Sequence, residues 1–251
     1  MAALPTIRLK KMRIDVYLSN SGIVSSRTEA KNFIDEGAVS VNGVIVKKAS
    51  FDVDGSEDIT VDKSVKEFVS RGGLKLKAAL RQFNIDVKDR LCLDVGASSG
   101  GFTDCLLQCG AKHVIAVDSG SGQLTDSIRC DERVTSIESY NARYMKREDF
   151  AYTPDLAVMD VSFISATYII PAVFDVLNNG SDFVCLIKPQ FEVGRSGIGK
   201  GGIVKDSKIR DSAVKKVLGF AVDIGFEVKG IIQSPIRGGD GNIEFLAHFV
   251  K

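Results

Sequence analysis

A run of small and acidic residues, Asp94-Val-Gly-Ala-Ser-Ser-Gly-Gly-Phe-Thr103, has the composition of a ligand-binding turn. It follows an apolar run and precedes a segment with helical periodicity. Glycine lets the backbone turn sharply and approach a ligand closely, because it has no Cβ. Another acid, Asp118, ends the next apolar run and could accept hydrogen bonds from the hydroxyls of a ribose. The pattern predicts a nucleoside-binding loop between a strand and a helix.

The glycine spacing indicates which ligand this loop binds. Dinucleotide loops read G-x-G-x-x-G and hold a pyrophosphate at a helix N-terminus. Here the spacing is D-x-G-x-x-x-G-G, which disfavours a nicotinamide dehydrogenase. S-adenosylmethionine has no pyrophosphate but carries a sulfonium, an amine and a carboxylate, so an acid at the start of the loop is useful. We predict a site for this cofactor, with a generic strand-to-helix turn as the alternative. The predicted cofactor residues of the loop and the next strand are Asp94, Gly96, Ala97, Ser98, Gly100, Gly101, Phe102, Thr103 and Asp118.

The elements that must position this loop alternate between strand and helix from residue 91 onward. The apolar runs that predict buried parallel strands cover 91–95, 114–117, 134–137, 156–159 and 183–187. Helices are expected near 102–109, 122–129, 164–177 and 207–224, and two last strands over 225–232 and 242–249. This order predicts an α/β fold of the Rossmann-like, doubly wound type with a mostly parallel sheet. The glycine-rich stretch 189–206 is expected to be a functional loop, such as a lid over substrate.

The residues before this domain predict a small α+β unit. Ser26 and Glu29 are spaced as a capping box, and Asn42-Gly43 between β-branched runs is a strong hairpin signal. Residues 1–48 carry eight Lys/Arg and four Asp/Glu, which fits a module that contacts phosphate, although a solvated surface explains the charge nearly as well. The run from Ser26 to Gly43 resembles the alpha-L motif, an RNA-binding domain of the ribosomal-protein "S-four" type. The resemblance implies binding of structured RNA, with Arg13, Arg27, Lys31, Lys47, Lys48 and Arg71 as candidate contacts.

The whole chain resembles the TlyA family, an alpha-L module followed by an FtsJ-like methyltransferase domain. The match includes Ser70-Arg-Gly-Gly-Leu-Lys75, the loop from Asp94 to Asp104, and Lys188-Pro-Gln-Phe-Glu192. The resemblance implies the Lys-Asp-Lys-Glu tetrad of ribose 2′-O-methyltransferases, here Lys75, Asp160, Lys188 and Glu244. Asn141 stands where class I methyltransferases contact adenine.

The chemistry of a ribose methylation agrees with these residue types. A ribose hydroxyl is a poor nucleophile and must lose its proton as it attacks the methyl group, and the match implies Lys188 as the base. Burial and the nearby cation of Lys75 favour the neutral amine, whereas Asp160 acts in the opposite direction by attracting the ammonium. The expected role of Asp160 is to orient Lys188 and the methyl donor. Glu244 is expected to hold Lys75, since a buried acid is costly unless it is paired.

Composition limits the other function classes. The two histidines and five cysteines form no metal-ligand pattern, so no metal is expected, and the cysteines read as core residues in a reducing compartment. We found no signal-peptide pattern and no apolar run of membrane-span length, which predicts a cytoplasmic protein without integral membrane association.

These patterns predict the domain division and the function together. We expect an RNA-binding domain at 1–61, a linker at 62–74 and a methyltransferase domain at 75–251. The predicted function is S-adenosylmethionine-dependent methylation of ribosomal RNA, most simply at cytidine 2′-hydroxyls, with ribosomal RNA or subunits as partners. The alternatives are a haemolysin and a non-catalytic assembly factor. A base methyltransferase is disfavoured because Asp160-Val-Ser-Phe163 lacks the Asn/Asp-Pro-Pro-aromatic motif.

Overall fold

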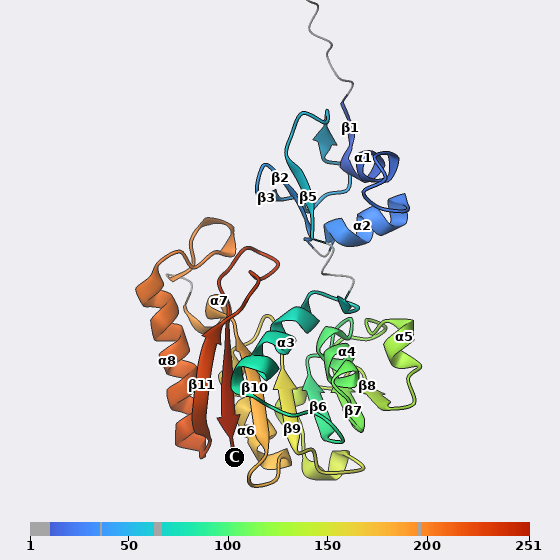
Figure 1. The fold of residues 1–251 in the computed structure, drawn as a ribbon. Helices are drawn as coiled ribbons and strands as arrows, with labels where there is room; N and C mark the ends of the chain where they lie inside the picture. The colour runs from blue at the N-terminus through green and yellow to red at the C-terminus, as the bar shows by residue number, and fades with distance from the viewer. Residues whose placement is uncertain (1–10, 36, 63–66, 195–196) are drawn as a thin grey trace, which may run out of the picture. The chain divides into compact units, whose positions relative to one another are not determined.

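The chain forms two compact units, Met1–Lys66 and Glu67–Lys251 (Figure 1). The computed structural model describes residues 11–35, 37–62, 67–194 and 197–251. The second unit therefore starts within the linker expected at 62–74. The reason is packing: Phe68 is buried in the core of the second unit, and helix α3 (Gly72–Phe83) begins before residue 75.

The first unit packs two helices beside short antiparallel strands. Its elements are β1 (Met12–Arg13), α1 (Ile14–Asn20), α2 (Arg27–Asp35), β2 (Val39–Val41), β3 (Val44–Ile45), β4 (Asp52–Val53) and β5 (Ile59–Val61). The strands pair as β3-β2-β5 and β1-β4. The predicted hairpin is confirmed, since Asn42 and Gly43 both have positive φ between the paired Val41 and Val44. Ile14, Leu18 and Ile34 are fully buried in a core of this unit's own.

The second unit is built on a seven-stranded sheet. Its strands are β6 (Leu91–Val95), β7 (His113–Val117), β8 (Val134–Ile137), β9 (Leu156–Met159), β10 (Asp182–Ile187), β11 (Glu227–Gln233) and β12 (Phe245–Val250). They lie in the order β11-β12-β10-β9-β6-β7-β8. Strands β6 to β10 are parallel, and β12 is antiparallel to both β10 and β11. The predicted α/β, Rossmann-like fold with a mostly parallel sheet is confirmed.

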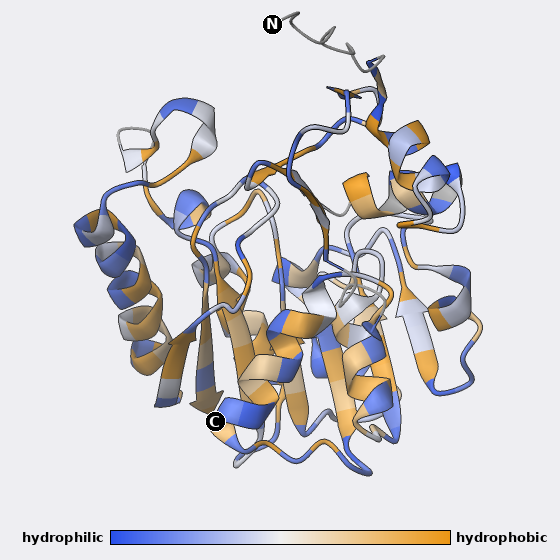
Figure 2. Cartoon of the chain, turned by 45° about the horizontal axis from the view of Figure 1, so that its top comes forward, coloured by the Kyte–Doolittle hydropathy of each residue, from blue (hydrophilic) through white to orange (hydrophobic). Residues whose placement is uncertain are grey.

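Helices cover both faces of this sheet. They are α3, α4 (Gly101–Gln108), α5 (Asp126–Arg129), α6 (Ile170–Val176), α7 (Pro189–Glu192) and α8 (Ser207–Ile224). One core cluster joins α3, α4 and α5 to the side chains of one face of the sheet, and the other joins α6 and α8 to the opposite face. Figure 2 shows the apolar residues concentrated on the strands and on the helix sides that face them.

Three element boundaries differ from the expected ones. The segment 164–177 divides into a 3-10 turn, Ala166–Tyr168, and helix α6, whose second residue is Pro171. The helix expected over 122–129 is the single turn α5. Strand β12 begins at Phe245, so Glu244 lies just before the strand.

Candidate active site

The loop between β6 and α4 takes the backbone shape that its glycines allow. Gly96 has a φ of +85°, and a Cβ there would lie 2.5 Å from the carbonyl oxygen of Asp160. Gly100 has a φ of +97° and directly precedes helix α4. The amides of Gly96 and Ala97 both donate to the carbonyl of Val117, at the end of the neighbouring strand. These two glycines let the loop pass close to the segment that follows β9.

Asp94 is a fully buried acid beneath this loop. Its Oδ2 accepts a 2.7 Å hydrogen bond from Thr103 Oγ1, whereas Oδ1 has no partner among the described residues. Burial raises the pKa of Asp94 to about 7, and the nearby carboxylate of Asp160 acts in the same direction. A buried carboxylate oxygen without a donor is costly, so a cationic or hydrogen-bonding ligand would relieve this site.

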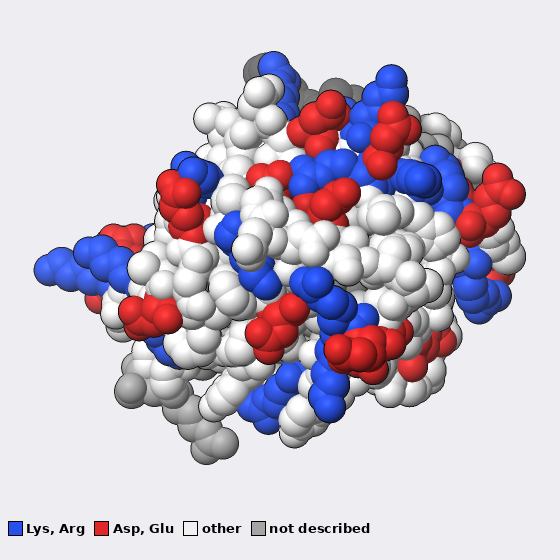
Figure 3. All heavy atoms as spheres, turned by 90° about the horizontal axis from the view of Figure 1, so that it is seen from below, with Lys and Arg blue, Asp and Glu red and all other residues white. Residues whose placement is uncertain are grey.

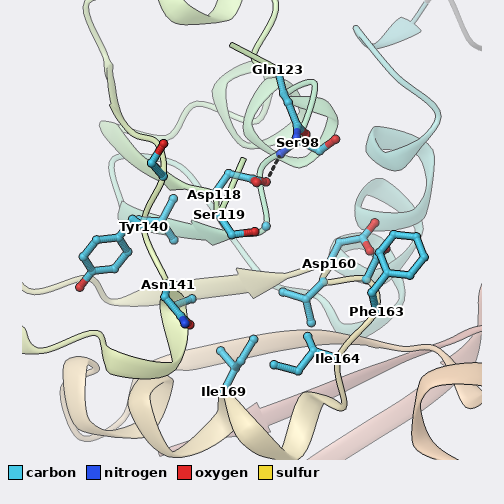
Figure 4. A pocket seen from close by; sticks show the side chains of 16 residues that line it. Ser98, Asp118, Ser119, Gln123, Tyr140, Asn141, Asp160, Phe163, Ile164 and Ile169 are labelled. Carbon is cyan, nitrogen blue, oxygen red and sulfur yellow. Dashed lines mark hydrogen bonds between the residues drawn. The ribbon is translucent and has the colours of Figure 1, made fainter. Parts of the chain in front are cut away.

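A pocket of about 670 Å³ opens at the carboxyl ends of the parallel strands (Figure 4). This volume lies in the range of small-molecule sites. Five of the predicted cofactor residues line it, namely Gly96, Ser98, Asp118, Asn141 and Asp160. The other predicted residues, Asp94, Ala97, Gly100, Gly101, Phe102 and Thr103, do not line it; they shape the turn or lie beneath it.

Asp118 is fixed at the rim of the pocket by two backbone bonds. Its Oδ2 accepts from the amide of Ser98 at 2.8 Å, and its Oδ1 accepts from the amide of Gly120 at 2.7 Å. Each carboxylate oxygen can accept more than one hydrogen bond, so this side chain can still bind hydroxyl donors. Asn141 also lies at the pocket, and its Oδ1 accepts from the amide of Arg143 at 3.1 Å, a bond that does not use its NH₂ group.

Lys188 and Asp160 form an ion pair at the ends of neighbouring strands. Lys188 Nζ lies 2.6 Å from Asp160 Oδ1, and it donates a 2.6 Å hydrogen bond to Ser162 Oγ. The Lys188 and Asp160 side chains are 12% and 20% exposed, so the pair is sheltered but open to a ligand. The pairing follows from the fold, because β9 and β10 are parallel neighbours and both residues directly follow their strands.

Lys75 and Glu244 form a second, more deeply buried ion pair. Lys75 Nζ donates to Glu244 Oε2 at 2.7 Å, with only 9% and 2% of the two side chains exposed. Lys75 lies in α3, and Glu244 directly precedes Phe245, which pairs with Ile187 across the β10–β12 ladder. Glu244 and Lys188 therefore lie at the same end of the β10–β12 strand pair. The structure brings the four predicted catalytic residues together at the end of the sheet where the parallel strands finish.

The loop before β12 packs tightly around the carboxylate of Glu244. A Cβ at Gly238 would overlap Glu244 Oε1. Asn242, which is 1% exposed, accepts from the amide of Val204 at 2.9 Å and donates to the carbonyl of Gly202 at 3.0 Å. The described part of the stretch 189–206 is thus tied to the segment that carries Glu244; a lid role for it stays a prediction.

Three residues at the site carry roles that the sequence patterns did not assign. Ser162 contacts Lys188, as described above. Phe163 is 91% exposed with a φ of +65°, and its ring centroid lies 5.3 Å from that of Phe191. Glu192 is buried and accepts from Ser165 Oγ at 2.5 Å and from the amide of Ala166 at 2.7 Å. Glu192 thereby ties helix α7, after Lys188, to the segment that follows Asp160.

The predicted RNA contacts lie in both units. Arg13 and Arg27 both bind Asp15, and Lys31, Lys47 and Lys48 are exposed on the first unit. Arg71 belongs to the second unit, where its Nη2 donates to the carbonyl of Arg237 at 3.1 Å. The face seen in Figure 3 carries acidic and basic side chains interspersed, in keeping with the net charge of +1. RNA affinity would therefore come from local groups of basic residues, not from overall charge.

Comparison with known proteins gives the same division of the chain. The profile for FtsJ-like methyltransferases matches residues 68–251, and the S4 domain profile matches residues 12–59. The chain belongs to the FtsJ-like methyltransferase family. It is 41% identical to the 16S/23S rRNA (cytidine-2′-O)-methyltransferase TlyA of Mycobacterium tuberculosis, over 94% of this chain and 88% of that protein. The predicted resemblance to the TlyA family is confirmed.

Two further relatives, both named hemolysin, are at least as similar to the chain in sequence identity. Hemolysin A of Brachyspira hyodysenteriae is 45% identical over 95% of this chain and all of that protein. A solved structure from Streptococcus thermophilus that carries the name hemolysin has a TM-score of 0.77 and 46% identity, covering 97% of this chain and 89% of its own. Among the described residues, none of the helices combines the length and apolar character needed to cross a membrane.

Proposed function

We propose that the chain transfers a methyl group from S-adenosylmethionine to ribose 2′-hydroxyls of ribosomal RNA, at cytidine. The observation that carries the proposal is the presence of two sheltered ion pairs, Lys188–Asp160 and Lys75–Glu244, the first of which contributes Asp160 to the wall of the pocket of about 670 Å³. The substrate follows from the M. tuberculosis relative, whose name states cytidine 2′-O-methylation of 16S and 23S rRNA.

The residues of the pocket fit the proposed cofactor, which supplies the methyl group when it is bound. Asp118 accepts hydrogen bonds from the ribose diol, and Asn141 contacts the adenine. Asp94, which is buried beneath the loop with one unpartnered oxygen, would favour a positively charged group in the pocket through its charge and not through direct contact with the pocket. Gly96, Ala97, Ser98, Gly100, Gly101, Phe102 and Thr103 shape the loop around it.

The four charged residues divide the work of proton removal and positioning. Lys188 Nζ first releases its own proton to solvent; the neutral amine then takes the proton from the substrate 2′-hydroxyl and returns to the ammonium form that pairs with Asp160. Asp160 and Ser162 hold that amine in place at 2.6 Å each, and Asp160 also orients the methyl donor. Glu244 fixes Lys75, whose cation stabilises negative charge that develops on the ribose oxygen. The residues of the pocket and Asp160 would contribute further by holding the methyl donor close to the substrate hydroxyl.

The first unit supplies RNA affinity in this proposal. Arg13, Arg27, Lys31, Lys47 and Lys48 contact phosphates of structured RNA, and Arg71 of the second unit is a separate candidate contact. We propose an RNA-binding domain at 1–61 and a catalytic domain at 67–251, joined by a shorter linker than the one expected at 62–74. We propose a cytoplasmic location, because ribosomal RNA and ribosomal subunits are the proposed substrates.

Membrane lysis is the competing function, because two relatives bear the name hemolysin. It predicts lysis by purified protein at low concentration that does not depend on Lys188. An assembly factor without catalysis predicts RNA binding that survives every change to the four charged residues.

The test is transfer of labelled methyl from S-adenosylmethionine to unmodified ribosomal subunits. The native chain is compared with Lys188→Ala and with Lys208→Ala, which changes an exposed lysine of α8 that belongs to neither ion pair. We expect transfer by the native chain and Lys208→Ala and none by Lys188→Ala. Transfer by Lys188→Ala at the native rate would remove Lys188 from the mechanism, and no transfer by any chain would reject the proposed reaction.

A further inference from the structure

The segment 160–164 follows β9 and forms one wall of the pocket. The ladder between β9 and β10 ends at the pair Met159–Cys185, so the sheet does not hold this segment. The amide of Asp160 donates to the carbonyl of Val95 at 3.0 Å, which anchors the start of the segment. Within the described chain, its four remaining residues make no hydrogen bond between backbone groups. The position of the segment therefore depends on what holds its far end.

The carboxylate of Glu192 holds the far end of this segment. Glu192 Oε2 accepts from Ser165 Oγ at 2.5 Å, and Oε1 accepts from the amide of Ala166 at 2.7 Å. Ser165 is the N-cap of the 3-10 turn that begins at Ala166. The Glu192 side chain is only 2% exposed, so water cannot easily replace these bonds if they are lost.

Glu192 is itself fixed from two sides. It ends helix α7, which directly follows Lys188. From helix α8, Lys216 Nζ donates to the backbone carbonyl of Glu192 at 3.0 Å and lies 3.4 Å from its Oε2. One buried side chain thus joins the chain after Lys188 to the far end of the segment 160–164.

The conformation of Phe163 indicates that this segment is restrained. Its φ of +65° is unfavourable for a residue with a Cβ and persists where the surrounding structure imposes it. The ring of Phe163 contacts that of Phe191, the residue directly before Glu192. Ser162, directly before Phe163, accepts the 2.6 Å hydrogen bond from Lys188 Nζ. A segment free to move would lose this contact with Lys188.

We propose that Glu192 is a positioning residue for the methyl transfer, because its hold on Ser165 and Ala166 places Ser162 against Lys188. The inference rests on the proposed function. Glu192 is not among the residues that line the pocket of about 670 Å³, so it acts through Ser162 and not on the reacting atoms. A displacement of about 1 Å can cost about 100-fold in the rate of a reaction that depends on alignment.

This role requires the length of the Glu192 side chain more than its charge. Glu192→Gln keeps the length, since its Oε1 can accept from the amide of Ala166 and its NH₂ group can donate to Ser165 Oγ. Glu192→Asp keeps the charge but is one methylene shorter, so it cannot reach both partners unless the segment moves. If Glu192 served only as a buried charge that pairs with Lys216, the order of the two variants would be reversed.

The experiment measures kcat for methyl transfer to unmodified ribosomal subunits at saturating S-adenosylmethionine and saturating subunits. We expect Glu192→Gln to stay within about 3-fold of the native kcat and Glu192→Asp to fall about 10-fold. The control is Asp182→Asn, which changes an acid at the opposite end of β10 and should keep the native kcat. A native kcat in Glu192→Asp, a larger loss in Glu192→Gln than in Glu192→Asp, or an equal loss in Asp182→Asn overturns the proposal.

A second background tests whether Glu192 acts through Ser162. Ser162→Ala alone should lower kcat about 10-fold, and Glu192→Asp should then add less than about 2-fold, because the contact that it protects is already gone. A further loss of about 10-fold in that background means that Glu192 acts through another group and overturns the proposal. No methyl transfer by the native chain would reject the proposed function, whereas native transfer with an unaffected Glu192→Asp would reject only this role.

Discussion

Variants of the buried ion pair Lys75–Glu244 can distinguish a role in stability from a role in catalysis. With 9% and 2% of the two side chains exposed, each charge depends on the other at 2.7 Å. Glu244→Ala leaves Lys75 buried without its partner, which costs about 3–5 kcal/mol. For a domain of this size, such a loss lowers the melting temperature by roughly 6–20 °C. Replacement of both residues by methionine keeps the apolar volume and removes both charges, so its stability should stay within about 1 kcal/mol of native.

The double methionine variant should be nearly as stable as the native chain but almost inactive. The double variant lacks the positive charge and its holder, so its methyl-transfer rate should fall at least about 100-fold despite near-native stability. Thermal unfolding followed by circular dichroism and labelled methyl transfer to ribosomal subunits give the two readouts on the same preparations. A double variant that is stable and transfers methyl at the native rate would show that the pair serves the fold alone. A Glu244→Ala variant as stable as the native chain would contradict the burial argument.

Three further predictions concern other buried or exposed groups. Burial raises the pKa of Asp94 to about 7, so its cost to stability builds up as the pH rises from the unfolded value of about 3.9 and is complete above about 7. Asp94→Asn should therefore stabilise the cofactor-free chain by up to about 4 kcal/mol at pH 8. The gain should shrink as the pH falls to 5, while affinity for S-adenosylmethionine in calorimetry should drop; equal gains at both pH values would refute the charge explanation. Phe163→Ala should leave the melting temperature unchanged, since the ring is 91% exposed, but should lower transfer efficiency about 10-fold if the ring stacks on an RNA base, and Phe163→Trp should restore it. Asp182 accepts from His248 Nε2 at 2.7 Å and Arg90 Nη1 at 2.6 Å; burial opposes ionisation, but these bonds prevail and lower the pKa of Asp182. This stability is present above the ordinary value of about 3.9 and is lost as the pH falls through the lowered value. Asp182→Asn should therefore cost about 2 kcal/mol at pH 7 and progressively less below pH 4, as urea unfolding would show.

Short sequence motifs correctly predicted the turns and helix starts whose conformation depends on a few neighbouring residues. The Asn42-Gly43 turn needs two residues that tolerate positive φ, and the Ser26 cap needs a side-chain acceptor at a helix start; both formed as expected. The parallel strands were visible because strands covered on both faces read as apolar runs. Strand order then explains why Asp160 and Lys188 meet, as both follow neighbouring strands.

Features set by tertiary packing were not predictable in this way. Phe68 packs into the core of the second unit. That unit therefore begins before residue 75, where the catalytic domain was expected to start. The contact of Lys188 with Ser162 and the bonds of Glu192 to Ser165 join residues more than twenty positions apart. Glu192 stood in the stretch Lys188-Pro-Gln-Phe-Glu192, which was noted for its resemblance alone. The position of Asp94 beneath the pocket, not at its wall, depends on how the loop folds over it.

The most direct test of the account is the chemical identity of the methylated nucleoside. Unmodified ribosomal subunits are incubated with the native chain and S-adenosylmethionine, and the RNA is digested to nucleosides and analysed by mass spectrometry. The account predicts 2′-O-methylcytidine from the native chain and none from Lys188→Ala. A methyl group on a base, or 2′-O-methylcytidine formed equally well by Lys188→Ala, would contradict it.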